Sequence, residues 1–310
     1  MEKKIDIAAL GELLVDFTPA GLSESGMRLF EQNPGGAPAN MLAAAAAFGL
    51  KCAFMGKIGQ DMHGEFLRSV LESTGIDTIG LVTDPGYFTT LAFVSLTIEG
   101  ERNFSFARKP GADTRLLPEE LDREILSNCK IFHVGSLSLT DEPSRSTTFE
   151  AVRLAKEAGA VISYDPNYRA PLWPSQEAAM EMMRSMIAFA DIMKISDEET
   201  ALLTPHEDPL KAAEFLVASG VKIAVVTQSS KGSLVVCKEG YVEVPGFMAR
   251  VVDTTGAGDS FWGGLLAKFV LEKVDIDHLS QKQLYTIARY GNAAASLCIE
   301  KRGGISGIPT

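Results

Sequence analysis

The stretch Val251–Phe261 reads VVDTTGAGDSF, and an apolar segment that predicts a helix near Ala257–Glu272 continues from it. The small residues Gly256, Ala257 and Gly258 let backbone N–H groups approach an anion closely. Where such residues begin a helix, these N–H groups and the helix dipole together attract negative charge. The stretch therefore predicts an anion hole at the start of a helix.

Asp259 falls in the first turn of this predicted helix, beside any anion that the small residues bind. A carboxylate in that place repels a resting phosphate, so its presence needs a reason. One reason is that it accepts a proton from an attacking hydroxyl group. Another is that it only complements the helix dipole, as acidic residues in first turns often do. The motif alone leaves both interpretations open.

A second cluster, PGGAPAN at Pro34–Asn40, leads into an alanine-rich segment that predicts a helix over Pro38–Phe48. Gly35 and Gly36 can bring backbone amides close to a ligand, and Asn40 offers both a donor and an acceptor to a hydroxyl-rich molecule. A tight turn before a helix would explain the same pattern. The sequence has no Walker loop, no G-x-G-x-x-G after the first strand and no G-x-S-x-G elbow, which disfavours P-loop, dinucleotide-binding and hydrolase chemistry.

Strand-like apolar runs alternate with helix-like segments along most of the chain. The expected strands are Ile5–Phe17, Cys52–Ile58, Ile131–Gly135, Val161–Asp165, Asp191–Ile195 and Val221–Thr227. The expected helices, besides the two above, are Asp61–Ser73, Ser144–Ala158, Gln176–Ala190, Pro209–Ser219 and Gln281–Glu300. Such alternation indicates an α/β fold in which a central, mostly parallel sheet is covered by helices on both faces.

One region departs from this pattern. Thr89–Ile98, the turn Glu99-Gly100 and Glu101–Lys109 predict an antiparallel hairpin with apolar residues on both faces. We expect Ala92, Val94, Leu96 and Ile98 on one face, and Leu91, Phe93, Phe104 and Phe106 on the other. Met27–Glu31 adds a further candidate strand. The hairpin is either an ordinary sheet edge or, as its two apolar faces favour, a projecting lid over the active-site edge.

Composition excludes several classes of protein. Of the 310 residues, 46% are hydrophobic and 22% charged, which is typical of a folded domain, and the net charge of −11 argues against binding to nucleic acid. The apolar run Met41–Leu50 is far too short to span a membrane. We expect a cytoplasmic protein with reduced, buried thiols, because no C-x-x-C pair joins Cys52, Cys129, Cys237 and Cys298. No repeat or linker divides the chain, so residues 1–310 are expected to form one domain, with the lid contributed by about 12–34 and 87–108.

Taken together, the motifs resemble the ribokinase-like (pfkB) carbohydrate kinase family, and within it the bacterial and plant fructokinases. The two glycine clusters, PGGAPAN and DTTGAGD, match the two signatures of that family. The resemblance runs through the whole chain and includes Gly11–Asp16 (GELLVD), Gly56–Gly59 (GKIG), Ile131–Leu139 (IFHVGSLSL), Asp165–Trp173 (DPNYRAPLW), Lys194–Glu199 (KISDEE) and Gly303–Thr310 (GGISGIPT).

This resemblance implies a role for each matching residue. Asp259 would be the catalytic base, and Gly256, Ala257 and Gly258 would form the anion hole for the transferred phosphoryl group. The substrate pocket would be lined by Asp16, Gly35, Gly36, Asn40, Arg108 and Arg169.

The resemblance also implies sites for the nucleotide and for two cations. The nucleotide site would include Lys194, Ser196, Thr227, Gly232 and Asn292, although Ser229 replaces a glycine that the family usually has. Glu199 would help to place Mg²⁺ through water. Asp253, Thr255 and Gly303 match a monovalent-cation (K⁺) site, in which Gly307 stands where several relatives have serine.

The implied activity is that of a sugar kinase that transfers the γ-phosphate of ATP to the primary 6-hydroxyl of fructose. Alternatives within the family are 2-keto-3-deoxygluconate kinase, ribokinase and aminoimidazole riboside kinase. An alternative of another class is a sugar-sensing regulator without catalysis, but such a protein would need no base at Asp259. The partners we expect are the sugar, ATP and a second copy of the chain bound through the lid, with no nucleic acid and no membrane.

Overall fold

A computed structural model describes residues 3–96 and 102–308. Within them, nine strands form the main sheet in the order β13-β12-β11-β10-β9-β8-β1-β4-β5. Neighbours from β11 to β5 pair in parallel, whereas β12 and β13 pair antiparallel at one end. The strands are β1 (Ile5–Leu10), β4 (Cys52–Gly59), β5 (Leu81–Asp84), β8 (Cys129–Gly135), β9 (Val161–Asp165), β10 (Ile192–Ser196), β11 (Ile223–Thr227), β12 (Ser233–Cys237) and β13 (Gly240–Val244).

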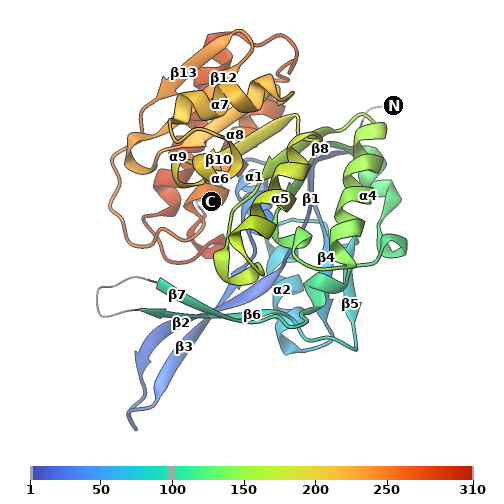
Figure 1. Cartoon of the computed structure of the whole chain (residues 1–310). Coiled ribbons are helices and arrows are strands. Elements are labelled where there is room, and N and C mark those ends of the chain that lie inside the picture. The colour runs from blue at the N-terminus through green and yellow to red at the C-terminus, as the bar shows by residue number, and fades with distance from the viewer. Residues whose placement is uncertain (1–2, 97–101, 309–310) are drawn as a thin grey trace.

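Helices cover both faces of this sheet, as predicted (Figure 1). One apolar core lies under α1 (Ala37–Ala47), α2 (Met62–Ser73), α8 (Ala257–Leu271) and α9 (Gln281–Cys298). A second core lies on the opposite face under α3 (Arg123–Asn128), α4 (Ser144–Glu157), α5 (Gln176–Ile187), α6 (Thr200–Leu203) and α7 (Pro209–Ala218). Burial on both faces explains why the central strands are almost continuously apolar.

A separate four-stranded sheet has the order β3-β2-β6-β7 and consists of β2 (Leu14–Leu22), β3 (Arg28–Gly35), β6 (Leu91–Leu96) and β7 (Arg102–Ala107). Figure 1 shows it projecting from the α/β body, as expected of a lid. The candidate strand at Met27–Glu31 is real and longer, although it pairs with β2 rather than with the hairpin. The turn Glu99-Gly100 lies outside the described residues.

The structure corrects two predictions of local structure. The run Ile5–Phe17 is two strands, because the chain bends at Gly11-Glu12-Leu13 and passes from the main sheet into the lid. The two hairpin faces were also divided wrongly. Phe106 lies directly opposite Ala92, and residues opposite each other in an antiparallel pair share a face. Phe106 therefore belongs to the face of Ala92 and Val94, not to that of Phe93.

Candidate active site

A cavity of about 300 Å³ lies where the carboxyl ends of the parallel strands meet the starts of α1 and α8. Ligands of open α/β sheets bind at this edge. The cavity is lined by Glu12, Leu14, Asp16, Gly36, Ala37, Asn40, Phe106, Leu137, Asn167, Arg169, Lys194 and Thr254–Asp259. The two glycine clusters, more than 200 residues apart in the chain, thus form opposite walls of one site.

The start of α8 has the features of an anion hole. Gly256 caps the helix in the left-handed conformation, with φ of 76°. The first N–H groups of an α-helix have no partner within the helix, and those of α8 begin at residues that line the cavity. The helix has 15 residues, so its dipole adds a partial positive charge at this end. A phosphoryl group placed here would meet both contributions.

Asp259 lies in the first turn of α8, and its half-buried side chain packs against Asn40 of α1. The Asn40 Nδ2 donates a hydrogen bond of 2.8 Å to the Asp259 Oδ2. Gly263 makes this approach possible, because a Cβ there would lie 2.4 Å from the carbonyl oxygen of Met41. Close contact between the two helices brings the two side chains together, and a carboxylate so fixed can accept a proton from a neighbouring hydroxyl.

Burial raises the pKa of Asp259, and the carboxylate of Asp165 adds to this effect. The hydrogen bond from Asn40 and the positive charges of Lys194 and Arg169 act in the opposite direction. A raised pKa makes a carboxylate a stronger base while nearby cations keep it ionised. This balance is what proton abstraction requires.

Lys194 in the middle of β10 forms a buried ion pair with Asp165 at the end of β9. The Nζ to Oδ2 distance is 2.6 Å, and the two side chains are 6% and 4% exposed. Burial opposes the charge of the ammonium, but Asp165, Glu199 and Asp259 together raise the pKa of Lys194. The ammonium lies 3.4 Å from where a Cβ of Gly258 would be. It therefore brings a fixed positive charge to the anion hole.

The wall opposite α8 consists of Gly36 and its neighbours. Gly36 has φ of 117°, and a Cβ there would be 2.4 Å from the carbonyl oxygen of Glu12. Only glycine fits such a backbone. Gly35 approaches Asp16 in the same way, so the PGG segment lies flat against the bend that leads into the lid.

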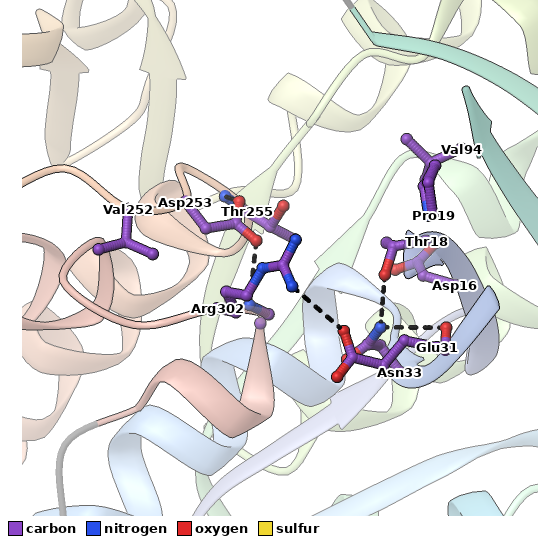
Figure 2. Close-up of a pocket in the computed structure, with 12 residues that line it drawn as sticks. Asp16, Thr18, Pro19, Glu31, Asn33, Val94, Val252, Asp253, Thr255 and Arg302 are labelled. Carbon is purple, nitrogen blue, oxygen red and sulfur yellow. Dashed lines mark hydrogen bonds and ion pairs between the residues drawn. The ribbon is translucent and has the colours of Figure 1, made fainter. Parts of the chain in front are cut away.

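A second cavity of about 250 Å³ adjoins the first and shares Asp16 and Thr255 with it. Figure 2 shows its lid wall, where the Asn33 Nδ2 donates to the Thr18 Oγ1 over 2.9 Å. Across it, Arg302 and Glu31 approach to 3.9 Å. The other lining residues include Val94, Asp253, Gly303 and Gly304.

The two candidate arginines have different surroundings. Arg169 lines the first cavity and donates from Nη1 to its neighbour's carbonyl oxygen, on Tyr168, over 3.0 Å. Arg108 does not line this cavity. Its buried guanidinium donates to Asp113, to Thr140 and to the carbonyl oxygen of Leu137, each over 2.8 Å. These contacts fix the junction between β7 and the body of the protein.

Of the residues expected at the nucleotide site, Ser196 and Thr227 end β10 and β11, and Asn292 lies on α9 beside the end of β13. Apart from Lys194, the expected residues do not line either of these two cavities. The Asn292 Nδ2 donates to the carbonyl oxygens of Val244 and Pro245. The Thr227 hydroxyl donates to the carbonyl oxygen of Ile195 over 3.4 Å, and Gly232 turns the chain after β11 with φ of 103°.

The carboxylates expected at the cation sites accept backbone hydrogen bonds from neighbouring loops. Both oxygens of Glu199 accept backbone N–H groups, one from Tyr168 and one from Ser196, whose hydroxyl also donates to it. Asp253 accepts the N–H groups of Thr255 and Gly303 over 2.8 and 3.0 Å. Residues 3–96 and 102–308 contain no group of three or more His, Cys, Asp or Glu side chains that could hold a metal ion.

The lining residues of these cavities that were not predicted as site residues from the sequence include Glu12, Asn33, Phe106 and Leu137. Glu12 sits inside the GELLVD segment, so its place in a matching motif was the available signal. Asn33 directly precedes the PGG segment. Phe106 and Leu137 carry no chemical signal, and only the folded chain brings them to the cavity.

The fold and the site define a phosphotransferase, with a half-buried carboxylate at the start of α8 and a lid that lines the same cavity. The family model of pfkB family carbohydrate kinases matches residues 4–310. The chain belongs to this family.

Individual relatives agree with that assignment. A probable fructokinase-3 of Arabidopsis thaliana is 42% identical over 307 residues, which cover 98% of this chain and 88% of that protein. The fructokinase of Xylella fastidiosa, solved with bound ATP, superposes with a TM-score of 0.89 at 32% identity and covers 98% of this chain and 95% of the other. A double mutant of the Vibrio cholerae O395 fructokinase, solved with fructose, ADP and potassium ion bound, superposes with a TM-score of 0.88 at 30% identity. The match covers 100% of this chain and 96% of the other.

Proposed function

We propose that this carbohydrate kinase transfers the γ-phosphate of ATP to the primary 6-hydroxyl of fructose. The observation that carries the proposal is Asp259, half-buried in the first turn of α8 and held by Asn40. A charge complementing the helix dipole would need neither burial nor an oriented partner. A carboxylate that must meet one hydroxyl needs both.

In this proposal each group of the site has a task. Asp259 accepts the proton of the sugar hydroxyl as its oxygen bonds to phosphorus and the bond to ADP breaks. The α8 N-terminus and Lys194 stabilise the negative charge on the transferred group, a form of catalysis that is effective in a site shielded from water. Arg169 at the cavity wall adds a further positive charge.

The donor set also fits the cations that we propose. Mg²⁺ keeps several waters and is held mainly by nucleotide phosphates, where it would neutralise charge. Glu199 uses both oxygens to anchor backbone N–H groups, so it would act on Mg²⁺ through water. For K⁺ we propose the loops that Asp253 ties together at Thr255 and Gly303.

The polar groups of the two cavities favour a neutral sugar over a sugar acid. Asp16 lies in both cavities and would repel a carboxylate. A sugar acid needs an arginine turned toward it. Arg108 is held by Asp113 and Thr140. Among the described residues, Arg169 lines the first cavity, and Arg302 lines the second, where it lies 3.9 Å from Glu31. Asn33 and Asn40 are suited to hydroxyl groups.

We therefore expect fructose to give the highest kcat/KM in a panel of sugars. Ribose and 2-keto-3-deoxygluconate should be at least ~10-fold poorer, because a site that pairs with hydroxyl groups rejects analogues that leave its polar groups unpaired. A coupled assay of ADP release with each sugar measures this. If a sugar acid or a riboside gave the highest value, the chain would be a kinase of that substrate, and the roles of Asp259 and α8 would stand. No turnover with any sugar would favour the sensing regulator.

We further propose a homodimer formed through the outer face of the lid. The rings of Phe17 and Phe93 stack at 5.2 Å, and Phe30 meets Phe93 edge-on at 6.1 Å. Phe30 and Phe93 are nevertheless 43% and 38% exposed, and Leu22, which pairs with Arg28 two residues before Phe30, is exposed as well. An exposed apolar patch of this kind usually marks an interface. A second copy of the chain presents the same patch and would cover it.

The dimer is tested with Phe93→Asp. We expect sedimentation at micromolar concentration to give about twice 33.3 kDa for the unchanged chain and 33.3 kDa for the variant. Phe215→Asp is the matched control, because Phe215 on α7 is also exposed but lies away from the lid. A 33.3 kDa species for the unchanged chain would contradict the proposal.

Two broader expectations complete the proposal: residues 1–310 act as one catalytic domain, and the protein works in the cytoplasm. The described cysteines are all free and buried, which suits a reducing compartment. Among residues 3–96 and 102–308, the helices include none that is long and apolar enough to cross a membrane.

A further inference from the structure

Glu12 lies in the bend that joins the main sheet to the lid, and its side chain is buried at the cavity wall. It is only 3% exposed and lines the same cavity as Asp16, Asn40 and Asp259. Its Oε1 accepts the N–H of Ala37 over 2.9 Å, at the first residue of α1. This bond joins the bend to the PGG segment and places a negative charge at a helix N-terminus, where it is favoured.

The second oxygen, Oε2, is buried and has no hydrogen-bond partner among the described residues. An unsatisfied buried polar atom is unfavourable, and more so when it is charged. The charge of Arg108 acts on Glu12, but its guanidinium donates its hydrogen bonds to Asp113, Thr140 and Leu137 and not to Oε2. Proteins keep such atoms where a ligand supplies the missing partner.

Rotation of other protein groups does not readily supply this partner. The adjacent carboxylate, Asp16, has no proton to donate when it is ionised. The Asn40 Nδ2 is held in place by the hydrogen bond that it donates to Asp259. A hydroxyl donor that reached Oε2 from the cavity would satisfy it and leave both contacts in place, and the proposed substrate is a molecule rich in hydroxyl groups.

We infer that Glu12 is a specificity-determining residue whose Oε2 accepts a hydrogen bond from one hydroxyl of the bound sugar, other than the hydroxyl that is phosphorylated. The inference rests on the proposed function, since it takes the cavity as the sugar site. In this arrangement Oε1 holds the start of α1 in place, and Oε2 accepts a hydrogen bond that distinguishes one sugar from another. One carboxylate thereby couples the shape of the PGG segment to the choice of substrate.

The charge state of Glu12 supports this role. Burial raises its pKa to about 7, while the Ala37 N–H and the positive charge of Arg108 lower it and Asp113 raises it. A hydroxyl donor stabilises the charged form and returns the pKa toward lower values. Sugar binding should therefore be accompanied by proton release near neutral pH, which calorimetry in two buffers of different ionisation enthalpy detects.

The test compares the unchanged chain with Glu12→Gln on fructose and on its 1-, 3- and 4-deoxy analogues. The amide oxygen of the introduced glutamine can still accept the Ala37 N–H, but the charged acceptor is lost. We expect the unchanged chain to reject one analogue at least ~10-fold more strongly than the others. Glu12→Gln should lower kcat/KM for fructose by about the same factor. For the rejected analogue, kcat/KM of the variant should stay within twofold of that of the unchanged chain, and the KM for ATP should not change.

Several controls make the outcome decisive. Glu150→Gln, at an exposed carboxylate on α4, should change none of these values. Glu12→Asp keeps the charge but withdraws it from the cavity, so it should show the same selective loss if Glu12→Gln fails to fold. Equal losses for fructose and every analogue would mean that Glu12 only supports the backbone, and would overturn the inference. If the unchanged chain prefers another sugar, the proposed function fails, and the same comparison is made with deoxy analogues of that sugar.

Discussion

Asp259→Asn should reduce kcat by at least ~10²-fold, because it removes the proton acceptor while keeping the size of the side chain. The introduced amide can still pair with Asn40, so the contact between α1 and α8 should survive. Fructose binding measured by calorimetry should therefore stay within a small factor of that of the unchanged chain. Turnover would be followed by coupled release of ADP at saturating ATP and sugar.

Two comparisons show whether a loss of turnover in Asp259→Asn comes from the missing proton acceptor or from a disturbed fold. Asp277→Asn removes an exposed carboxylate that pairs with Lys222, and it should leave kcat unchanged. The Asp259→Asn variant should unfold at a denaturant concentration at least as high as the unchanged chain, since burial of its carboxylate is unfavourable. Turnover of Asp259→Asn close to that of the unchanged chain would show that another group accepts the proton.

The parts of the site that could be predicted from the sequence are those whose chemistry is local. Gly256 and Gly36 must be glycine because of their backbone angles, and each stands beside a helix start that the residue pattern reveals. The α/β alternation follows in the same way, because a strand buried on both faces has to be apolar along its length. Such features depend on residues close together in the chain.

Features that depend on pairing between distant segments could not be predicted. The face on which Phe106 lies is set by its register against Ala92, and a shift of one residue reverses the face. Strand β13 is not predicted because it lies at the sheet edge, where exposed residues alternate with less exposed ones. Strand β12 is buried at all five positions, and its local sequence does not show that it pairs with β11 and β13. Arg108 was expected in the substrate pocket, but nothing in its local sequence reveals that Asp113 and Thr140 would hold it.

Lys194→Met should lower the free energy of unfolding by about 3–5 kcal/mol, the usual cost of removing one partner from a buried ion pair. Met is close to Lys in length but leaves Asp165 charged and without its counter-ion at 4% exposure. This loss is a large share of the roughly 5–15 kcal/mol that stabilises a typical protein. Urea unfolding at pH 7 would measure it, together with the turnover of the folded fraction, which should fall because the anion hole loses its fixed charge.

The double variant Lys194→Met/Asp165→Asn distinguishes the ion pair from simple packing. If the lost stability comes from the unpaired carboxylate of Asp165, neutralising that carboxylate should recover a large part of the lost free energy of unfolding. Turnover should stay low, because the positive charge beside Gly258 is still absent. The effect of Lys194 on stability and its effect on turnover would then be measured separately in the same set of variants. If Lys194→Met alone were as stable as the unchanged chain, water or another group would have to compensate the charge of Asp165. The buried ion pair would then contribute little to the stability of the protein.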